Sequence, residues 1–538
     1  MRARDGVSER YLSLRRNSVG ACRRKIIVPD MKTKAERDAD TNNSGEIQQE
    51  PRTLSMVCLV LLLLLSSFFA LNRSNTAYGT DEVWSVKTAS LNYSAEIAAL
   101  KADVHPPLYF LILHSWMRLF GTEERTVRSL SGLFYLLSVF AVFGIGRELY
   151  GRKTALLCAV IYLSSPLAIL AAQFARMYSL LSLLSILSTW LYLQFSNKPR
   201  DSRVLFALYV VVNVLGTFTH IAFFFLLFAQ IVFQLFFYRR IRIKRFVLAI
   251  VLSLAPYLFL WAPVLLQQVA ISREGLLWVK KPEPSMLPDL LFQFGGAFWL
   301  VLPLLLYLRW RSGFDSFRDS SKRLTSLPLW LLAITLLTPL LISEFKPIFI
   351  PRLAIVSLHL FALTIGALAG KGANYLLSIA VIAFTLMLLI VVHPASAPCD
   401  NREMAIYLSK TANDGDVVIF TSLTRSPIDY YLEQTRTSQK LFETSFPAEI
   451  DQHPGYEGNV RDPGRRAALE REAKSLMGRV GVMQSPSRMR RIFFFHGLRP
   501  EIDSLVEERL REHLELLPAQ GVKCAEIPPY FKEVSVYR

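Results

Sequence analysis

The chain has 538 residues, of which 52% are apolar and only 19% are charged, and its mean hydropathy is +0.32. This composition excludes an ordinary soluble protein and favours a membrane protein with many spans. The net charge of +18 is explained by basic loops and a basic tail near anionic lipid, so we expect no nucleic-acid partner.

The first 53 residues are polar and basic, and we expect them to form a disordered cytoplasmic tail. No cleavable signal peptide is recognisable before the first apolar run. Because nothing upstream of Met31 has the pattern of a structured element, Met31 is an alternative start to Met1.

Apolar runs of membrane-spanning length recur from residue 54 to about 393. Basic clusters at 147–153, 197–203, 238–245 and 308–323 separate them and mark short cytoplasmic loops. We therefore predict a mostly α-helical polytopic membrane domain over 54–395, with eleven spans and a range of nine to thirteen. These spans are 54–71, 127–147, 154–174, 178–196, 204–219, 221–238, 246–267, 287–308, 326–343, 353–370 and 372–392.

The first outer loop, residues 72–126, contains an apolar segment that differs from the predicted spans. This segment begins at Pro106 and Pro107 but includes His114 and Arg118, which suit a full span poorly. We expect a juxtamembrane or re-entrant helix on the outer side, with the crossing made by 127–147.

Residues 396–538 have a different pattern, in which short apolar strands alternate with amphipathic helices. This pattern predicts a small extracytoplasmic α/β domain, in which 444–488 is a long loop with a short helix. Cys399 and Cys524 lie near its two ends and are either a disulfide or two buried thiols. We find no metal-ligand motif, and any requirement for a divalent cation stays open.

Polar side chains gather on the predicted outer face of the membrane domain, where the apolar spans end. They are Asp81, Glu82, His105, Arg176, Tyr178, His220 and Arg352. Each one alone can be a residue that only anchors a helix end at the interface, and His220 can be a satisfied buried histidine. Together they predict a cavity with both acidic and basic groups at the membrane surface.

Such a cavity suits a substrate that has an apolar tail and an anionic phosphate at headgroup level. Arginine and histidine bind phosphate through charge-assisted hydrogen bonds. If the phosphate carries a sugar, a carboxylate can serve as the general base for the acceptor and can stabilise an oxocarbenium-like transition state. Asp81 or Glu82 is the predicted carboxylate.

The order of the motifs carries a family resemblance. The chain has an acidic pair in "YGTDE" (78–82), then "HPPLYFLILHSWMRLFG" (105–121), "ARMYSLL" (175–181), a histidine on the outer side, and "KPIFIPRL" (346–353). This order resembles the GT-C superfamily of polyprenyl-phosphate-sugar-dependent glycosyltransferases. That superfamily includes the dolichyl-phosphate-mannose protein mannosyltransferases, the bacterial family 39 enzymes and the aminoarabinose transferases. The resemblance covers about residues 54–395.

The resemblance implies a role for individual residues. Asp81 is the expected catalytic carboxylate, with Glu82 beside it. His105 stands where the aminoarabinose enzymes have a phosphate-binding lysine, so we expect a weaker, pH-dependent cation. Tyr178 stands where those enzymes carry an acid, and Arg352 is an expected phosphate contact.

The predicted function is transfer of a sugar from a polyprenyl phosphate to an acceptor on the outer face of the membrane, with inversion. We place the chain in the plasma (inner) membrane, with its N-terminus in the cytoplasm and its C-terminal domain in the periplasm or outside the cell. A flippase for a lipid-linked saccharide is the alternative, although neither internal repeats nor mid-membrane charges favour it. An inactive scaffold with the same fold is a third possibility. The sugar and the acceptor (a protein, lipid or polysaccharide) are left open.

Overall fold

The computed structural model describes residues 52–537 with several gaps. The gaps are 198–201, 237–242, 272–280, 297–319, 370–400, 436–439, 449–459, 484–490 and 515–533, together with positions 73, 104, 422, 461 and 498. Most of the predicted tail, the span at 372–392, most of the span at 287–308, and both Cys399 and Cys524 lie outside the described residues. The domain limits at 53 and 395 remain predictions.

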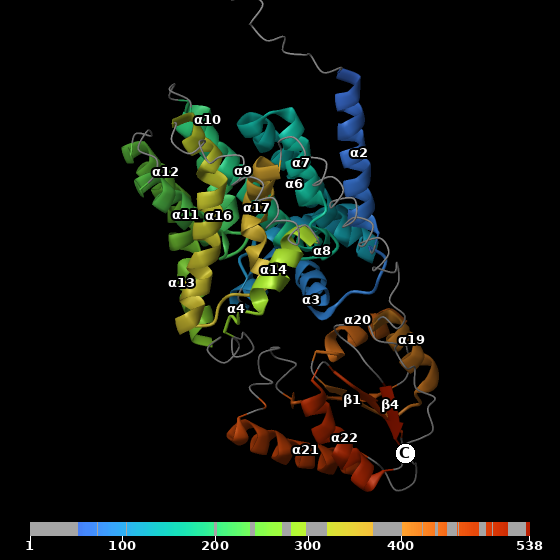
Figure 1. Ribbon diagram of the computed structural model, residues 1–538. Coiled ribbons are helices and arrows are strands. Elements are labelled where there is room, and N and C mark those ends of the chain that lie inside the picture. Colours follow the sequence, from blue (N-terminus) through green and yellow to red (C-terminus); the bar gives the residue numbers. More distant parts are fainter. Residues whose placement is uncertain are drawn as a thin grey trace, which may run out of the picture. The chain divides into compact units, whose positions relative to one another are not determined.

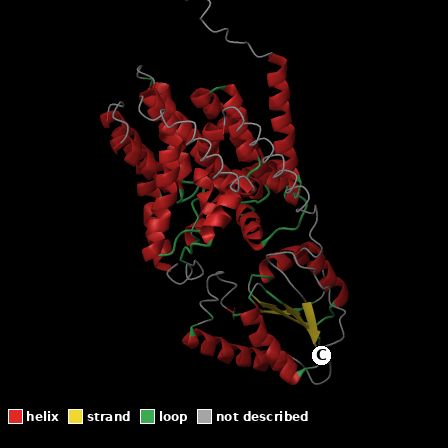
Figure 2. Ribbon diagram, in the orientation of Figure 1, coloured by secondary structure: helices red, strands yellow, loops and turns green. Residues whose placement is uncertain are grey.

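The first part of the described chain is helical (Figures 1 and 2). Its helices are α2 (Arg52–Leu71), α3 (Thr80–Ala89), α4 (Tyr93–Ala102), α5 (Leu108–Phe120), α6 (Glu124–Tyr150), α7 (Arg152–Leu163), α8 (Pro166–Ala172), α9 (Tyr178–Asn197), α10 (Arg203–Thr217), α11 (Phe223–Phe236), α12 (Ile243–Leu260), α13 (Ala262–Ile271), α14 (Met286–Gly295), α16 (Ser320–Phe345), the 3₁₀ helix η2 (Pro351–Ser357) and α17 (Leu358–Ala369).

Within the described residues, five helical segments are long and apolar enough to cross a membrane. They are Glu124–Tyr150, Tyr178–Phe195, Ile243–Leu260, Ser326–Phe345 and Pro351–Leu368. The pair α7 and α8 adds a sixth if it is counted as one bent span. The chain is therefore a multi-pass membrane protein. The predicted total of eleven spans stays a prediction, because α10 and α11 are short and two segments are not fully described.

The predicted span 154–174 is broken rather than continuous. α7 ends at Leu163, and α8 begins at Pro166 with an axis bent by 63°. Ser165 caps α8 because its hydroxyl accepts from the backbone N–H of Ala168, and proline in the first turn has no N–H to leave unsatisfied. The connection between α8 and α9, residues 173–177, carries Arg176.

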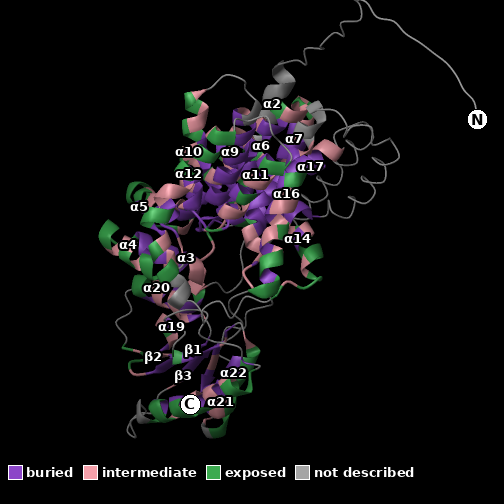
Figure 3. Ribbon diagram, turned by 90° about the vertical axis from the view of Figure 1, so that its left-hand side faces the viewer, coloured by how far each residue is buried: buried purple, intermediate pink, exposed green. Residues whose placement is uncertain are grey.

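Small residues allow the long helices to approach closely. A Cβ on Gly144 of α6 would lie 2.5 Å from the Trp190 ring on α9, and one on Gly366 of α17 would lie 2.2 Å from Cys158 Sγ on α7. Such contacts are typical of helices packed in a membrane. In Figure 3 the buried residues concentrate along these inner helices.

The C-terminal part of the described chain contains a four-stranded sheet. Strands β1 (Val417–Thr421), β2 (Phe442–Phe446), β3 (Ile492–Phe495) and β4 (Val534–Tyr537) lie in the order β2-β1-β3-β4. β1 pairs in parallel with β2 and β3, and β4 is antiparallel to β3. The accompanying helices are α19 (Asn401–Thr411), α20 (Arg425–Thr435), α21 (Pro463–Met483) and α22 (Pro500–His513).

Side-chain alternation along the strands explains why this sheet is covered on both faces. Val418 and Phe420 of β1 share a core with residues of α19 and α20, whereas Val417 and Ile419 share one with residues of α21 and α22. The prediction of a long loop with only a short helix over 444–488 is wrong, because the 21-residue helix α21 and the end of β2 lie there.

A buried ion pair joins α3 to α6. Glu82 and Arg128 are each about 3% exposed, and Arg128 donates to both carboxylate oxygens of Glu82, through Nε at 2.8 Å and Nη2 at 2.7 Å. Arg128 also donates to the carbonyls of Ser74, Thr76 and Ala77. This one guanidinium therefore fixes the loop between α2 and α3.

We predict that Arg128→Met lowers the free energy of unfolding by about 3 to 5 kcal/mol, because it leaves the Glu82 carboxylate buried without its cation. Arg125→Met, at an exposed position one turn earlier, is the matched control and should have little effect. Thermal unfolding in detergent measures both variants. Equal melting temperatures for the two would contradict the assignment.

Candidate active site

The N-terminus of α3 directs two neighbouring carboxylates to different surroundings. Gly79 is the N-cap, and Asp81 and Glu82 lie in the first turn, where the helix dipole favours negative charge. Successive side chains on a helix point about 100° apart, so the two carboxylates face different partners. Glu82 turns inward and Asp81 stays about one-third exposed.

Glu82 uses both of its oxygens within the protein. Besides Arg128, Oε1 accepts from the backbone N–H of Ala175 at 2.9 Å, and Oε2 accepts from that of Gly79 at 3.1 Å. Four donors on two buried oxygens leave little room for a substrate. Glu82 instead ties the start of α3 to Ala175, the residue before Arg176.

Asp81 faces a cationic surface. Arg352 of η2 donates from Nη1 to Asp81 Oδ2 at 3.3 Å. Burial by itself would raise the pKa of Asp81, but the charges of Arg176 and Arg352, together with His105, hold that pKa below its ordinary value of 3.8. The carboxylate is therefore ionised and able to accept a proton at neutral pH.

His105 connects an acid to an arginine. Its Nδ1 lies 2.7 Å from Asp103 Oδ2, and its Nε2 lies 3.0 Å from Nη2 of Arg176. Because a guanidinium only donates, Nε2 must be the acceptor and Nδ1–H must donate to Asp103. Burial, followed by the charge of Arg176, lowers the pKa of His105 even though Asp103 acts in the opposite direction. This imidazole is neutral.

Arg176 is a buried guanidinium, 4% exposed, that forms no ion pair within 4.0 Å in the described part of the chain. Its Nη1 donates to Ser85 Oγ at 3.3 Å, and its guanidinium lies 5.6 Å from the Trp84 ring and 5.9 Å from the Phe110 ring. Its Nε has no hydrogen-bond partner among the described residues. A desolvated cation with an unused donor favours the binding of an anion.

Tyr178 and His220 complete the cluster. The Arg352 guanidinium lies 5.7 Å from the Tyr178 ring, and the His220 ring lies 6.2 Å from the Tyr178 ring and 6.3 Å from that of His105. His220 Nδ1 accepts from the backbone N–H of Ala222, so the neutral ring carries its proton on Nε2. Burial and the nearby His105, Arg176 and Arg352 lower its pKa to about 3.

The structure thus brings six of the seven predicted residues into one cluster around Asp81 and places Glu82 behind them. Sequence reasoning missed Ser85 and Trp84, which contact Arg176, and Arg128, which holds Glu82. Ser85 lies four residues after Asp81 on α3, so helical spacing could have indicated it. No group of three or more potential metal ligands occurs among the described residues.

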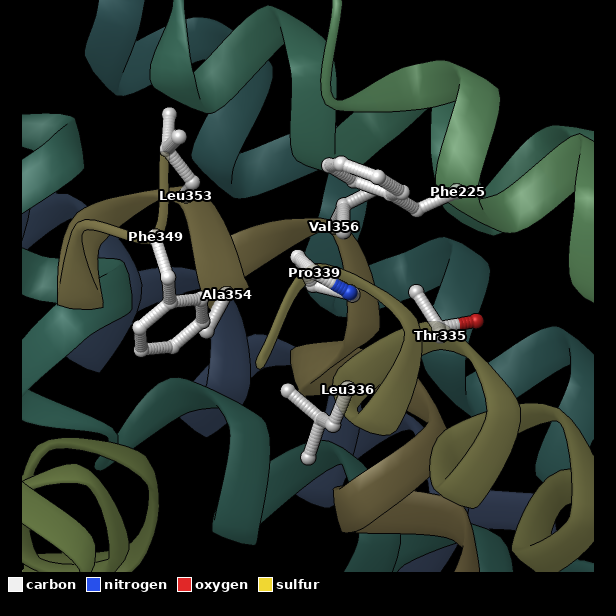
Figure 4. Close-up of a pocket in the computed structure, with 8 residues that line it drawn as sticks. All are labelled: Phe225, Thr335, Leu336, Pro339, Phe349, Leu353, Ala354 and Val356. Atoms are coloured by element: carbon white, nitrogen blue, oxygen red, sulfur yellow. The ribbon is translucent and has the colours of Figure 1, made fainter. Parts of the chain in front are cut away.

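A small apolar pocket lies next to this cluster along the chain. It is bounded by Phe349, Leu353, Ala354 and Val356 around η2, and by residues of α11 and α16 (Figure 4). Leu353 immediately follows Arg352. The segment that presents a guanidinium to Asp81 therefore also presents an apolar surface.

A second buried acid, Glu96, lies on the helix that ends at Asp103. α4 ends at its C-cap Asp103, and Glu96 on the same helix is fully buried with Oε2 at 3.2 Å from Nδ1 of His114 on α5. Tyr93 stacks on the His114 ring with 4.1 Å between the ring centroids. Burial raises the pKa of Glu96 from 4.5 to about 7.

Comparison with known proteins supports the resemblance to the GT-C superfamily. The family model of dolichyl-phosphate-mannose-protein mannosyltransferases matches residues 104–266, a region that contains His105, Arg176, Tyr178 and His220. The crystal structure of ArnT from Cupriavidus metallidurans in the apo state is similar, with a TM-score of 0.54 and 13% identity over 90% of this chain and 98% of that chain. The structure of the same protein bound to undecaprenyl phosphate gives the same values. The chain therefore shares the ArnT fold.

The oligosaccharyltransferase of Archaeoglobus fulgidus, in complex with zinc and sulfate, is a further structural match. It is 12% identical over 81% of this chain and 68% of that chain, with a TM-score of 0.48. No curated protein matches the sequence.

We predict that Glu96→Gln removes a pH dependence of stability. The folded state binds the Glu96 proton more tightly than the unfolded state, because the pKa rises from 4.5 to about 7 on folding. This contribution is present in full below about pH 4.5 and is lost as the pH rises to about 7. The melting temperature of the wild type should therefore fall between these pH values by more than that of Glu96→Gln. If the melting temperatures of the two proteins changed equally with pH, folding would not raise the pKa of Glu96.

Proposed function

We propose that the protein is a membrane glycosyltransferase that transfers a sugar from a polyprenyl-phosphate donor to an acceptor on the outer face of the plasma (inner) membrane. The observation that carries the proposal is the ionised, part-exposed carboxylate of Asp81 beside two guanidiniums. The ArnT fold supports it, because the similar protein has been crystallised bound to undecaprenyl phosphate.

In this reaction Asp81 is the general base. Its carboxylate removes the proton from an acceptor hydroxyl or amine while that group attacks the anomeric carbon of the sugar. The bond between the anomeric carbon and the phosphate oxygen breaks, and polyprenyl phosphate leaves from the opposite face. The sugar is therefore transferred with inversion.

The cations bind the phosphate. Arg176 has an unused N–H and a desolvated charge, and Arg352 lies 3.3 Å from Asp81 Oδ2, so both can stabilise the leaving phosphate. The Nε2–H of His220 is a neutral donor to the same group.

His105 and Glu82 act as positioning residues in this scheme rather than as a phosphate cation and a second catalytic carboxylate. His105 accepts from Arg176 and so orients it, and Asp103 fixes the tautomer. Glu82 fixes the start of α3. One carboxylate then performs the chemistry.

We predict that Asp81→Asn lowers kcat by about a hundredfold to ten-thousandfold, because the amide cannot accept the acceptor's proton. The measurement is transfer of radiolabelled sugar from a panel of polyprenyl-phosphate sugars by purified protein. The control is Asp289→Asn, which replaces an exposed aspartate on α14. Thermal unfolding verifies that both variants fold. Normal transfer by Asp81→Asn would show that Asp81 is not the base. If the wild type moves a lipid-linked saccharide across a vesicle membrane but transfers no sugar to an acceptor, the protein is a flippase.

We predict that His105→Gln retains more activity than His105→Lys. A glutamine amide can both accept from Arg176 and donate to Asp103, whereas lysine adds a third cation beside Arg176 and Arg352 and has no acceptor. Loss of a hydrogen bond to a charged group corresponds to about a tenfold effect or more on kcat/KM. Greater activity of His105→Lys would instead support the role of a phosphate-binding cation.

A further inference from the structure

We propose that Tyr431, on helix α20 far along the chain from the active site, is a positioning residue for Asp81. The inference rests on the proposed function, because the proposed function makes Asp81 the general base. It adds a structural task to the C-terminal part of the chain, which the similarity to ArnT does not assign.

The Tyr431 hydroxyl joins two elements of the helical part. It donates to Glu124 Oε1 at the start of α6 (2.6 Å) and accepts from the backbone N–H of Tyr78 (2.7 Å). Tyr431 is 2% exposed, so water cannot replace either bond without rearrangement. Glu124 is also held by Arg402 of α19, which forms an ion pair with its Oε1 at 2.6 Å and lies 5.5 Å from the centre of the Tyr431 ring.

The loop that leads into α3 is bound from two sides. On one side, Arg128 donates hydrogen bonds to the carbonyls of Ser74, Thr76 and Ala77. From the other side, Asn401 Nδ2 donates to the carbonyl of Tyr78 at 2.9 Å. The hydroxyl of Thr80 donates to the carbonyl of Leu423 at 2.9 Å.

These contacts end one residue before Asp81. Tyr78 is therefore fixed through its N–H by Tyr431 and through its carbonyl by Asn401, and the N-cap Gly79 follows directly. Because Asp81 lies in the first turn of α3, a shift of Tyr78 moves the Asp81 carboxylate relative to Arg352. A displacement of about 1 Å at a catalytic group can cost about a hundredfold in rate.

Tyr430 provides a matched control. It is the neighbour of Tyr431 on α20, and its ring packs edge-on against the ring of Tyr78 with 5.7 Å between the centroids. It therefore touches the same residue by packing, without a hydrogen bond to the loop. Tyr430→Phe keeps that packing, just as Tyr431→Phe keeps the Tyr431 ring.

The test compares full-length Tyr431→Phe and Tyr430→Phe in detergent. We expect Tyr431→Phe to lower kcat by about tenfold to a hundredfold with little change in KM for the lipid donor, and Tyr430→Phe to be close to the wild type. The acidic limb of the kcat profile should shift to higher pH in Tyr431→Phe, because Asp81 loses its alignment with Arg352. A purely structural role would lower the melting temperature without moving this limb.

A second readout does not depend on activity. Hydrogen exchange of the peptide that covers residues 74–80 should be about tenfold faster in Tyr431→Phe than in Tyr430→Phe, because the amide of Tyr78 has lost its acceptor. If Tyr431→Phe fails to fold, Asn401→Leu, which removes the donor to the Tyr78 carbonyl, is tested in its place.

The outcomes separate this inference from the proposed function. Faster exchange together with lower kcat supports positioning. Unchanged exchange, or faster exchange with unchanged kcat and pH profile, overturns it. If the wild type transfers no sugar while exchange still responds to Tyr431→Phe, the proposed function fails and the catalytic role of Tyr431 fails with it, although the contact between α20 and the loop is established.

Discussion

The buried ion pair between Glu82 and Arg128 is the constraint on which the rest of the site depends. Its carboxylate also accepts from Ala175 N–H, so one charged contact holds both α3, which carries Asp81, and the segment that carries Arg176. Burying two charges is costly unless both are fully hydrogen-bonded. Here the remaining N–H groups of Arg128 bind loop carbonyls. The same contact that stabilises the fold therefore sets the spacing between the proposed base and the proposed phosphate ligand.

The sequence identified the acidic pair but could not show which carboxylate faces the cluster of cations and which one forms the buried ion pair. Asp81 and Glu82 are adjacent and chemically similar, and only the direction in which α3 enters the core decides which one meets Arg128. The same limit applies to His105, whose position before two prolines indicated a cation. Its neutrality follows from Arg176 on one side and Asp103 on the other, and neither contact can be read from spacing. The residue types and their gathering in one cluster were predictable, whereas the partner of each residue depended on tertiary contacts.

The fold was predictable where hydrophobic patterns are long and regular. The helices around α6, α9 and α16 match predicted spans, since about 20 apolar residues leave few alternatives. The break between α7 and α8 was missed because Ser165 and Pro166 lie inside an apolar run. The length of α21 was missed for the opposite reason, since its sequence is rich in charge and glycine. Its apolar residues become a recognisable buried face only when they pack on the sheet, and they are Leu469, Ala473, Leu476 and Val480.

Charge balance connects this arrangement to the proposed reaction. Around the donor, two guanidiniums (Arg176 and Arg352) face two carboxylates (Asp81 and Asp103), and the lowered pKa values of His105 and His220 keep both imidazoles uncharged. A sugar-phosphate diester carries one negative charge, and the departing polyprenyl phosphate gains another. In the same step Asp81 takes up the acceptor's proton and loses its own charge. The site thus becomes more positive by one unit as the phosphate becomes more negative by one. A cationic histidine at position 105 would bind the donor more tightly before the reaction without adding to this change, and only interactions that strengthen toward the transition state accelerate the step.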